Sequence, residues 1–193
     1  MAEPAGGRLI RRGICHLVGD DVSMDDGIIP RRFAAERTTD PQLLLPHLFA
    51  NIDPALAGRM QHGDIVLAGR NFACGKPRVQ GFIAMSALGL AIVCRSMPYR
   101  MLRRAVARGM PVIVGGPDPA ALAASGDELE IDFSTGAVRN LSRGMHGDVP
   151  AMPPILRDIV AAGGMQAQLL DWLARHPEQA VEPQGNLWSA TDN

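Results

Sequence analysis

The stretch GDIVLAGRNFACGKPR, residues 63–78, decides the fold class of this chain of 193 residues. It begins with a run of consecutive apolar residues, Ile65–Ala68, which is typical of a short strand buried on both faces. The glycine-bearing loop 69–78 follows, and apolar residues then recur at helical spacing over 79–88. A strand, a loop and a helix in this order indicate one repeat of an α/β protein.

The same alternation continues toward the C-terminus. Residues 90–94 and 111–114 are short apolar runs, and a basic helix is expected between them over 98–108. The apolar face of that helix is expected to carry Tyr99, Leu102 and Val106. Short apolar strands that alternate with helices predict a mostly parallel sheet with flanking helices.

Local signals predict the elements on either side of this central part. A first strand is expected over 8–18. A helical segment over 40–60 begins at Asp40, a residue type that caps helices, and Pro46 is expected to kink or split it. The run 129–141 alternates around a serine–threonine–glycine turn, which predicts a β-hairpin.

The C-terminal part closes the expected domain. Two short helices are predicted over 153–162 and 165–175, separated by a pair of glycines. We expect one α/β domain over residues 8–175, a flexible N-terminus over 1–7 and a loose tail over 176–193.

Composition excludes several classes of function. The formal net charge is −1 and aromatic residues make up 4% of the chain, so it lacks both the positive field and the stacking platforms of a nucleic-acid-binding protein. No apolar run approaches the roughly 20 residues of a membrane helix, and the N-terminus lacks the apolar core of a signal peptide. We therefore expect a cytoplasmic protein with neither nucleic acid nor membrane as a partner.

The cysteines and histidines predict no metal site in this chain. The three cysteines, Cys15, Cys74 and Cys94, are too far apart for a disulfide framework and too few for a four-cysteine iron–sulfur site. Cys15 and Cys94 are expected to be buried, reduced thiols. None of the histidines has metal-ligand spacing to a cysteine; they are His16, His47, His62, His146 and His176.

Five ordered segments resemble the swivelling domain of the aconitase superfamily, and most closely the small subunit of 3-isopropylmalate dehydratases. The segment 63–78 is similar to the family pattern G-D-I-x-x-A-G-x-N-F-G-C-G-S-S-R-E-H-A. The segment GDDVSMDDGIIPRRF, residues 19–33, is similar to G-D-N-V-D-T-D-x-I-I-P-x-R-Y. The other matching segments are 109–114, 126–144 and 153–173. This resemblance implies an aconitase-type swivelling domain of β/β/α type over residues 8–175.

The resemblance also implies a two-part hydro-lyase or isomerase that reversibly dehydrates a hydroxy di- or tricarboxylate, with leucine biosynthesis as the implied pathway. A large partner subunit is implied to hold a 4Fe–4S cluster, whose iron acts as a Lewis acid on the leaving hydroxyl group. This chain is expected to bind no cofactor itself. The small subunit is implied to close over the cluster and to supply substrate-binding and base residues.

The central loop departs from the family at the position of its base. Where the family reads C-G-S-S-R-E-H, this chain reads CGKPRVQ over 74–80. The serine that serves as the family's base is replaced by Lys76, and the next serine by Pro77, whereas the carboxylate-binding arginine is retained as Arg78. The matching residues that are expected to shape the loop are Asn71, Cys74 and Gly75.

Three readings of Lys76 stay open. It is the base itself, if burial and the neighbouring Arg78 lower its pKa toward neutrality. Alternatively, it stays charged and pairs with an anionic group of a different substrate, or the site is catalytically silent. Pro77 is favoured in the first turn of a helix, so a helix is expected to begin near residue 77 and to direct its first amides toward an anion.

The segment 19–33 supplies the second part of the predicted site. Asp25 and Asp26 stand where the family has Thr-Asp, and the spacing to Pro30 favours Asp26 as the residue that hydrogen-bonds substrate. Arg32 matches a family arginine and is the third predicted substrate-binding residue, beside Arg78 and Asp26.

Two functions from different classes follow. The first is the small subunit of a two-part hydro-lyase, active only with a large subunit. The replacement of the family's serines over 76–77 motivates the alternative, a non-catalytic or regulatory paralogue that binds a hydroxyacid or a large subunit without turnover.

Overall fold

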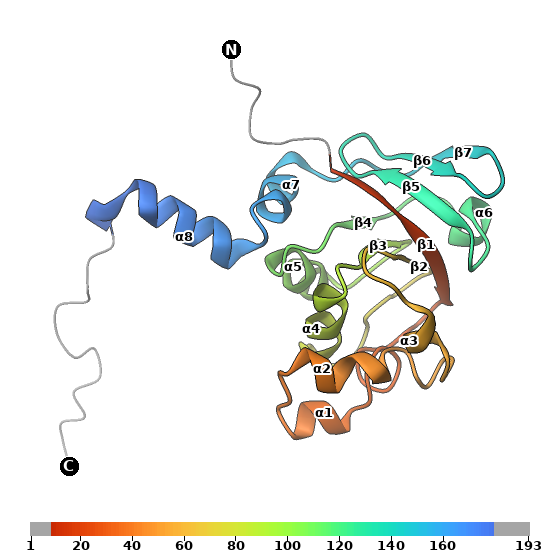
Figure 1. Cartoon of the computed structure of the whole chain (residues 1–193), viewed down its shortest axis with the longest axis horizontal. Coiled ribbons are helices and arrows are strands. Elements are labelled where there is room, and N and C mark those ends of the chain that lie inside the picture. Colours follow the sequence, from red (N-terminus) through yellow and green to blue (C-terminus); the bar gives the residue numbers. More distant parts are fainter. Residues whose placement is uncertain (1–8, 180–193) are drawn as a thin grey trace.

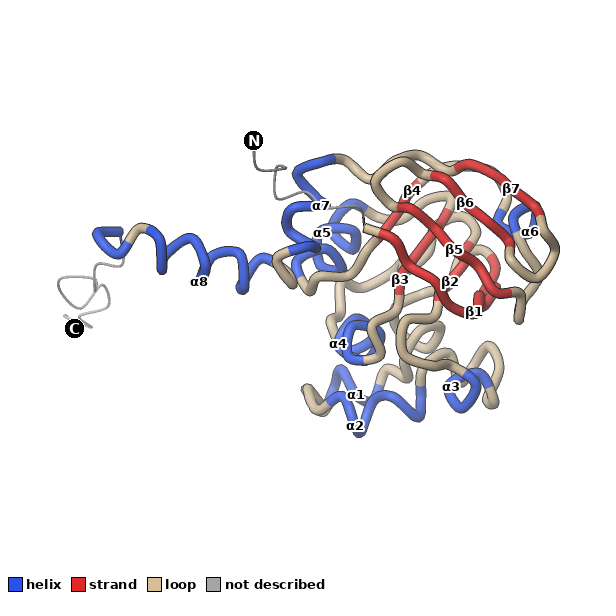
Figure 2. Tube along the Cα trace, turned by 45° about the horizontal axis from the view of Figure 1, so that its top comes forward, coloured by secondary structure: helices blue, strands red, loops and turns tan. Residues whose placement is uncertain are grey.

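The computed structural model describes residues 9–179, and a mixed 7-stranded sheet of order β4-β3-β2-β1-β5-β6-β7 forms its centre (Figures 1 and 2). The strands are β1 (Ile10–Gly19), β2 (Ile65–Ala68), β3 (Ala91–Cys94), β4 (Val112–Val114), β5 (Glu128–Asp132), β6 (Ala137–Asn140) and β7 (Met145–Asp148). The predicted α/β class is confirmed, and so are the predicted central strands.

One half of the sheet is parallel. β1 pairs with β2, β2 with β3 and β3 with β4, and Ile65 of β2 lies opposite Cys15 of β1 and Ala91 of β3. Every residue of β2 and β3 is buried. This burial explains why both strands read as unbroken apolar runs, since helices and loops cover both faces.

The other half is antiparallel. β5 runs antiparallel to β1, and β5 and β6 form the predicted hairpin. A further strand, β7, extends it and was not predicted. Its sequence, MHGD, is mostly exposed and shows no apolar alternation, so its pairing with β6 comes from backbone hydrogen bonds and not from a pattern of buried side chains.

The helices are short and lie around the sheet. They are α1 (Arg32–Ala35), α2 (Pro41–Leu44), η1 (Leu45–His47), α3 (Leu56–Arg59), α4 (Gln80–Ala87), α5 (Tyr99–Ala107), α6 (Pro119–Leu122), α7 (Pro154–Ala161), α8 (Met165–Arg175) and η2 (Pro177–Gln179). Figures 1 and 2 show α1, α2 and α3 beyond the C-terminal end of β1, and α8 projecting away from the sheet. No helix within residues 9–179 is long and apolar enough to cross a membrane.

Alternate residues of the parallel strands face two separate cores. Val66 and Ala68 of β2 belong to the core that contains α4 and the loops after β1. Ile65 and Leu67 belong to the core on the other face, with β5 and α7. Because strand side chains alternate between faces, this one short strand holds both layers together.

Several predicted elements differ in detail. The segment 40–60 is split at Pro46 into α2, η1 and α3, and Asp40 caps α2 by accepting a hydrogen bond from Gln42 N at 2.9 Å. The prediction that Tyr99 lies on the apolar face of α5 is wrong: Tyr99 begins the helix and is 71% exposed, and the buried positions include Met101 and Ala105. Helix α6 was not predicted. The expected flexible segment 1–7 lies outside the described residues, as does most of the expected tail 176–193.

Candidate active site

Two loops from neighbouring parallel strands meet at the candidate site. One follows β1 and the other follows β2, so both leave the carboxyl edge of the sheet, where α/β proteins commonly place their ligands. Met24 N donates to Cys74 O at 2.9 Å, and Cys74 N donates to Val22 O at 3.3 Å. These bonds form a short parallel bridge between Ser23 and Cys74 and join the two sequence segments that carry the family resemblance.

The residues predicted to shape the second loop make contacts that hold it in place. Asn71 has a positive φ of 56°, and its side-chain amide donates to Asp21 Oδ1 at 2.9 Å. Its backbone N–H donates to Ser96 Oγ at 2.7 Å. Gly75 has φ 84°, a region that glycine enters without the steric cost of a Cβ. Cys74 is half-buried, with Sγ 3.6 Å from Asp21 O.

An ion pair closes the base of the same loop. Arg70 donates from its backbone N to Asp20 Oδ1 at 2.7 Å and from Nε to Asp20 Oδ2 at 3.0 Å. These hydrogen bonds hold the pKa of the Asp20 carboxyl below its ordinary value. A Cβ on Gly69 would lie 1.8 Å from Asp20 Oδ1, so this close approach requires glycine at 69.

Arg78 lies beside Asp25. Arg78 Nε is 3.5 Å from Asp25 Oδ1, and the two side chains are 36% and 17% exposed. Both of these atoms are buried, yet neither makes a hydrogen bond with the residues that the structure describes. Asp25 therefore orients the guanidinium by charge without saturating its hydrogen-bonding capacity.

Lys76 is exposed two residues before Arg78 and makes no ion pair or side-chain hydrogen bond within residues 9–179. The prediction that a helix begins near 77 is wrong, because α4 begins at Gln80, after Val79 as its N-cap. The backbone N–H of Val79, just before this helix, donates a hydrogen bond to Gln80 Oε1 at 3.3 Å. An anion at Arg78 would therefore be held by side chains of the loop and not by the first turn of α4.

The other two predicted substrate-binding residues lie elsewhere in the segment after β1, Asp26 in the loop and Arg32 at the start of α1. Asp26 Oδ1 accepts a hydrogen bond from Arg31 N at 2.8 Å, so its carboxylate holds the turn that leads into α1. The Arg32 guanidinium lies 4.8 Å from the centre of the Phe33 ring, with Nη2 3.5 Å from His47 Nε2. The structure brings Asp25 to Arg78, whereas substrate contacts by Asp26 and Arg32 stay predictions.

Asp64 belongs to the Gly-Asp-Ile start of the segment 63–78 and was assigned no role from the sequence. Its Oδ2 lies 2.8 Å from His16 Nε2 and accepts from Gln61 N at 2.9 Å, and its Oδ1 accepts from Ile14 N at 3.0 Å. The Asp64 and His16 side chains are 4% and 5% exposed. The motif residue thus fastens β1 to the start of β2. Its match to the family pattern marked it in the sequence, but that pattern does not identify its partner.

The thiols and carboxylates within residues 9–179 do not fit an iron–sulfur cluster. Cys15 and Cys94 are buried and free, and burial raises the pKa of their thiols to about 11 and about 12. Thiolates are the form that binds metal. Within residues 9–179, no three His, Cys, Asp or Glu side chains are placed to hold a metal ion together.

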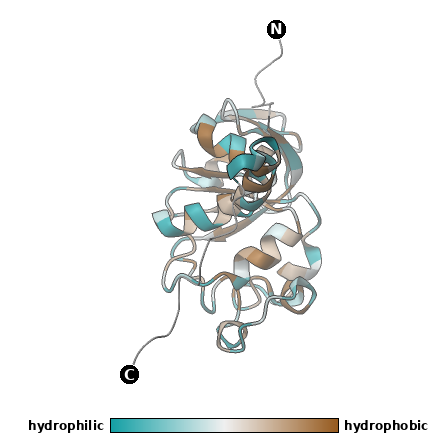
Figure 3. Cartoon of the chain, turned by 90° about the vertical axis from the view of Figure 1, so that its left-hand side faces the viewer, coloured by the Kyte–Doolittle hydropathy of each residue, from teal (hydrophilic) through white to brown (hydrophobic). Residues whose placement is uncertain are grey.

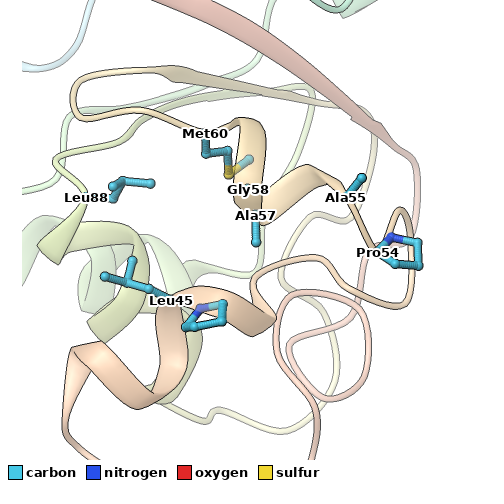
Figure 4. A pocket seen from close by; sticks show the side chains of 8 residues that line it. Leu45, Pro54, Ala55, Ala57, Gly58, Met60 and Leu88 are labelled. Carbon is cyan, nitrogen blue, oxygen red and sulfur yellow. The ribbon is translucent and has the colours of Figure 1, made fainter.

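A separate apolar cavity of ≈ 500 Å³ lies between η1, α3 and the end of α4 (Figure 4). Leu45, Met60 and Leu88 are among its lining residues, and it has no charged lining residue. None of the predicted site residues lines this cavity, so it is not part of the candidate site.

Comparison with known proteins identifies the family, although no protein-family model matches the chain. The small subunit of 3-isopropylmalate dehydratase from Moorella thermoacetica is 38% identical over 174 residues, which cover 90% of this chain and 100% of that protein. The small subunit of 2,3-dimethylmalate dehydratase from Eubacterium barkeri is 32% identical over 80% of this chain and 93% of its own length. The crystal structure of 3-isopropylmalate dehydratase from Methanocaldococcus jannaschii superposes with a TM-score of 0.79, at 30% identity over 89% of this chain and 99% of that one. The chain therefore belongs to the family of 3-isopropylmalate dehydratase small subunits.

Proposed function

We propose that this chain is the small subunit of a hydro-lyase and binds a hydroxy di- or tricarboxylate between the loops after β1 and β2. The observation that carries the proposal is Arg78, which is held beside Asp25 and keeps unused hydrogen-bonding capacity. The relatives named as subunits of 3-isopropylmalate and 2,3-dimethylmalate dehydratases support this substrate class and do not favour a non-catalytic paralogue.

Arg78 is the proposed anchor of a substrate carboxylate. A guanidinium offers two parallel N–H groups that match a carboxylate, and such charge-assisted pairs are among the stronger hydrogen bonds in proteins. Asp25 is the proposed positioning residue, because its carboxylate lies beside Nε and leaves the outer edge of the guanidinium for the ligand. This positioning role differs from the substrate hydrogen bond that the sequence predicts for Asp26, which stays a prediction.

Lys76 is the proposed base. Its neutral amine takes the proton from the carbon next to the hydroxyl-bearing carbon and becomes an ammonium ion. The electron pair of the broken C–H bond forms the carbon–carbon double bond as the C–O bond breaks, and the hydroxyl group leaves as water with a proton taken from solvent. Desolvation favours the neutral form of a lysine. Lys76 is exposed in this chain alone, so closure against a partner must supply that desolvation.

The partner is a large subunit, as the names of the relatives imply for a small subunit. We assign the 4Fe–4S cluster of the aconitase superfamily to that partner, since the described donors of this chain do not fit one. The departure of the hydroxyl group therefore belongs to the partner, and this chain contributes the carboxylate anchor and the base.

A second role for Lys76 is favoured by its exposure: it remains an ammonium ion and binds a second carboxylate of the substrate. The variant Lys76→Arg distinguishes the two roles. Arginine preserves a charged anchor, but it stays protonated in practice and cannot act as a base.

The test is to co-express the chain with its own large subunit, reconstitute the cluster without oxygen and screen hydration of citraconate, maleate, aconitate and the alkenes derived from isopropylmalate and homocitrate. We expect turnover of at least one of these substrates by the pair and none by the small subunit alone. A pair that assembles, carries a full cluster and turns over none of them would contradict the proposal.

A further inference from the structure

A groove lined by three arginines lies next to the candidate site. Its cavity of ≈ 420 Å³ is bordered by Pro77 of the site loop, by Met165 at the start of α8 and by one face of α5. The α5 residues that line it are Arg100, Arg103, Arg104 and Ala107. Their spacing of three and four residues places them side by side along the helix. Because Pro77 lies between Lys76 and Arg78, the groove is continuous with the loop that carries the proposed active-site residues.

The three guanidinium groups have no carboxylate partner within residues 9–179. Elsewhere in the described chain, arginines such as Arg12, Arg139 and Arg143 each pair with a carboxylate. Like charges on adjacent helical turns repel each other. Burial and the nearby Arg104 guanidinium also lower the pKa of Arg108 at the end of α5. An incoming anion would relieve this crowding of positive charge.

The side chains around the groove have the composition of a protein interface. Tyr99 is 71% exposed and Met165 is 52% exposed, and arginine, tyrosine and methionine are enriched in interface cores. On α8 the exposed apolar side chains continue from Met165 to Leu169 and Trp172, at helical spacing. Figure 3 looks toward the projecting helix and shows hydrophobic and hydrophilic residues side by side on it. No residue of α8 is buried.

We propose that the groove of Arg100, Arg103 and Arg104 docks an acidic segment of the large subunit. This inference rests on the proposed function and adds a surface through which the two subunits recognise each other. The unpaired positive charge selects an acidic partner, and the shared border at Pro77 places that contact beside the site loop. The groove opens to solvent, which suits a protein segment, whereas small-molecule pockets enclose most of their ligand.

The test compares two variants that lose the same charge. The first is Arg100→Gln/Arg103→Gln/Arg104→Gln, and the control is Arg12→Gln/Arg139→Gln/Arg143→Gln, whose arginines already have carboxylate partners. The dissociation constant of each from the large subunit is measured at low and high salt. We expect it to rise about 10–100-fold for the groove variant, with a weaker dependence on salt, and to change less than about threefold for the control.

Several results would overturn the inference, and they are distinguishable from failure of the proposed function. If the wild-type pair assembles and is active while the groove variant binds as tightly as wild type, the docking inference alone is wrong. If the groove variant loses only a self-association of this chain, a second copy and not the large subunit occupies the groove. If the wild-type chain neither binds the large subunit nor supports turnover, the proposed function itself fails. If the triple variant does not fold, the dissociation constant of the single variant Arg103→Glu is measured in its place, and the inference again expects it to rise.

Discussion

Near each end of β2, a carboxylate faces a nitrogen-bearing side chain, and the two pairs differ in one respect. At the start of the strand, Asp64 lies 2.8 Å from His16, and both of its oxygens also accept backbone hydrogen bonds. Beyond the other end, Asp25 lies 3.5 Å from Arg78, and the two facing atoms are buried without a hydrogen bond. Both pairs connect the β1 segment to the β2 segment, but only the first has all its hydrogen bonds satisfied among residues 9–179.

We propose that this difference separates a structural pair from one that binds a ligand. Buried polar groups in folded proteins are almost always hydrogen-bonded, so an incomplete pair calls for an explanation. The Asp64 pair uses its interactions to fix the register between β1 and β2. In the Asp25 pair, Arg78 Nε and Asp25 Oδ1 lack such bonds among the described residues, and we propose that a ligand carboxylate binds the remaining N–H groups of the guanidinium.

The largest expected effect belongs to Lys76, at the incomplete end. In the assembled enzyme, Lys76→Ala should lower kcat about 10²–10⁴-fold, the usual contribution of a positioned base, while substrate binding through Arg78 persists. The pH–rate profile of Lys76→Arg decides between the two roles. If Lys76 is the base, this variant should lose activity and one ionisation of the profile. If Lys76 is an anchor, much of the activity should remain. Activity of Lys76→Ala close to that of wild type would remove Lys76 from both roles.

Substitution of Asp64 in the complete pair should lower the stability of the protein and leave catalysis unaffected. Asp64→Ala leaves His16 and two backbone N–H groups buried without partners, so it should lower the free energy of unfolding by about 3–5 kcal/mol. Urea denaturation measures this directly. The matched control is Asp25→Ala: its pair is only partly buried, with side chains 36% and 17% exposed, and makes no hydrogen bond, so we expect a smaller loss of about 1 kcal/mol. Equal losses of unfolding free energy for the two variants would mean that both pairs serve stability to the same degree.

The third prediction concerns the geometry of the anchor. Arg78→Lys keeps the charge but loses the planar fork, so we expect KM to rise about 10–100-fold with a smaller change in kcat. Thermal unfolding of this variant should stay close to that of wild type. A large loss of stability with an unchanged KM would show that Arg78 is structural, like Asp64.

Much of this molecule could be predicted from sequence, and the exceptions have physical causes. The buried strands and the loop residues were predictable because unbroken apolar runs and the family pattern are local signals. Strand β7 has no such signal, since only pairing with β6 defines it. The choice between Asp25 and Asp26 depends on the backbone, because Asp26 has a φ of 63°, which directs the two adjacent side chains differently. No spacing rule contains that information.

The smallest expected effect lies at the base of the site loop, where Asp20 binds Arg70. Hydrogen bonds from Arg70 lower the folded-state pKa of Asp20 below its ordinary value of 3.8, so the folded state binds fewer protons than the unfolded state across this window. The contribution is therefore fully present above the ordinary pKa and is lost as pH falls through the lowered one. Asp20→Asn should remove this pH dependence, because the amide does not titrate there and its oxygen still accepts from Arg70 N. Hydrogen exchange of the Arg70 amide, compared at pH 6 and pH 3, should show wild-type protection falling toward that of the variant at the lower pH. A wild-type protection that stays constant across this range would mean that backbone contacts such as Asp21 N to Arg70 O, at 2.8 Å, hold the loop without the carboxylate.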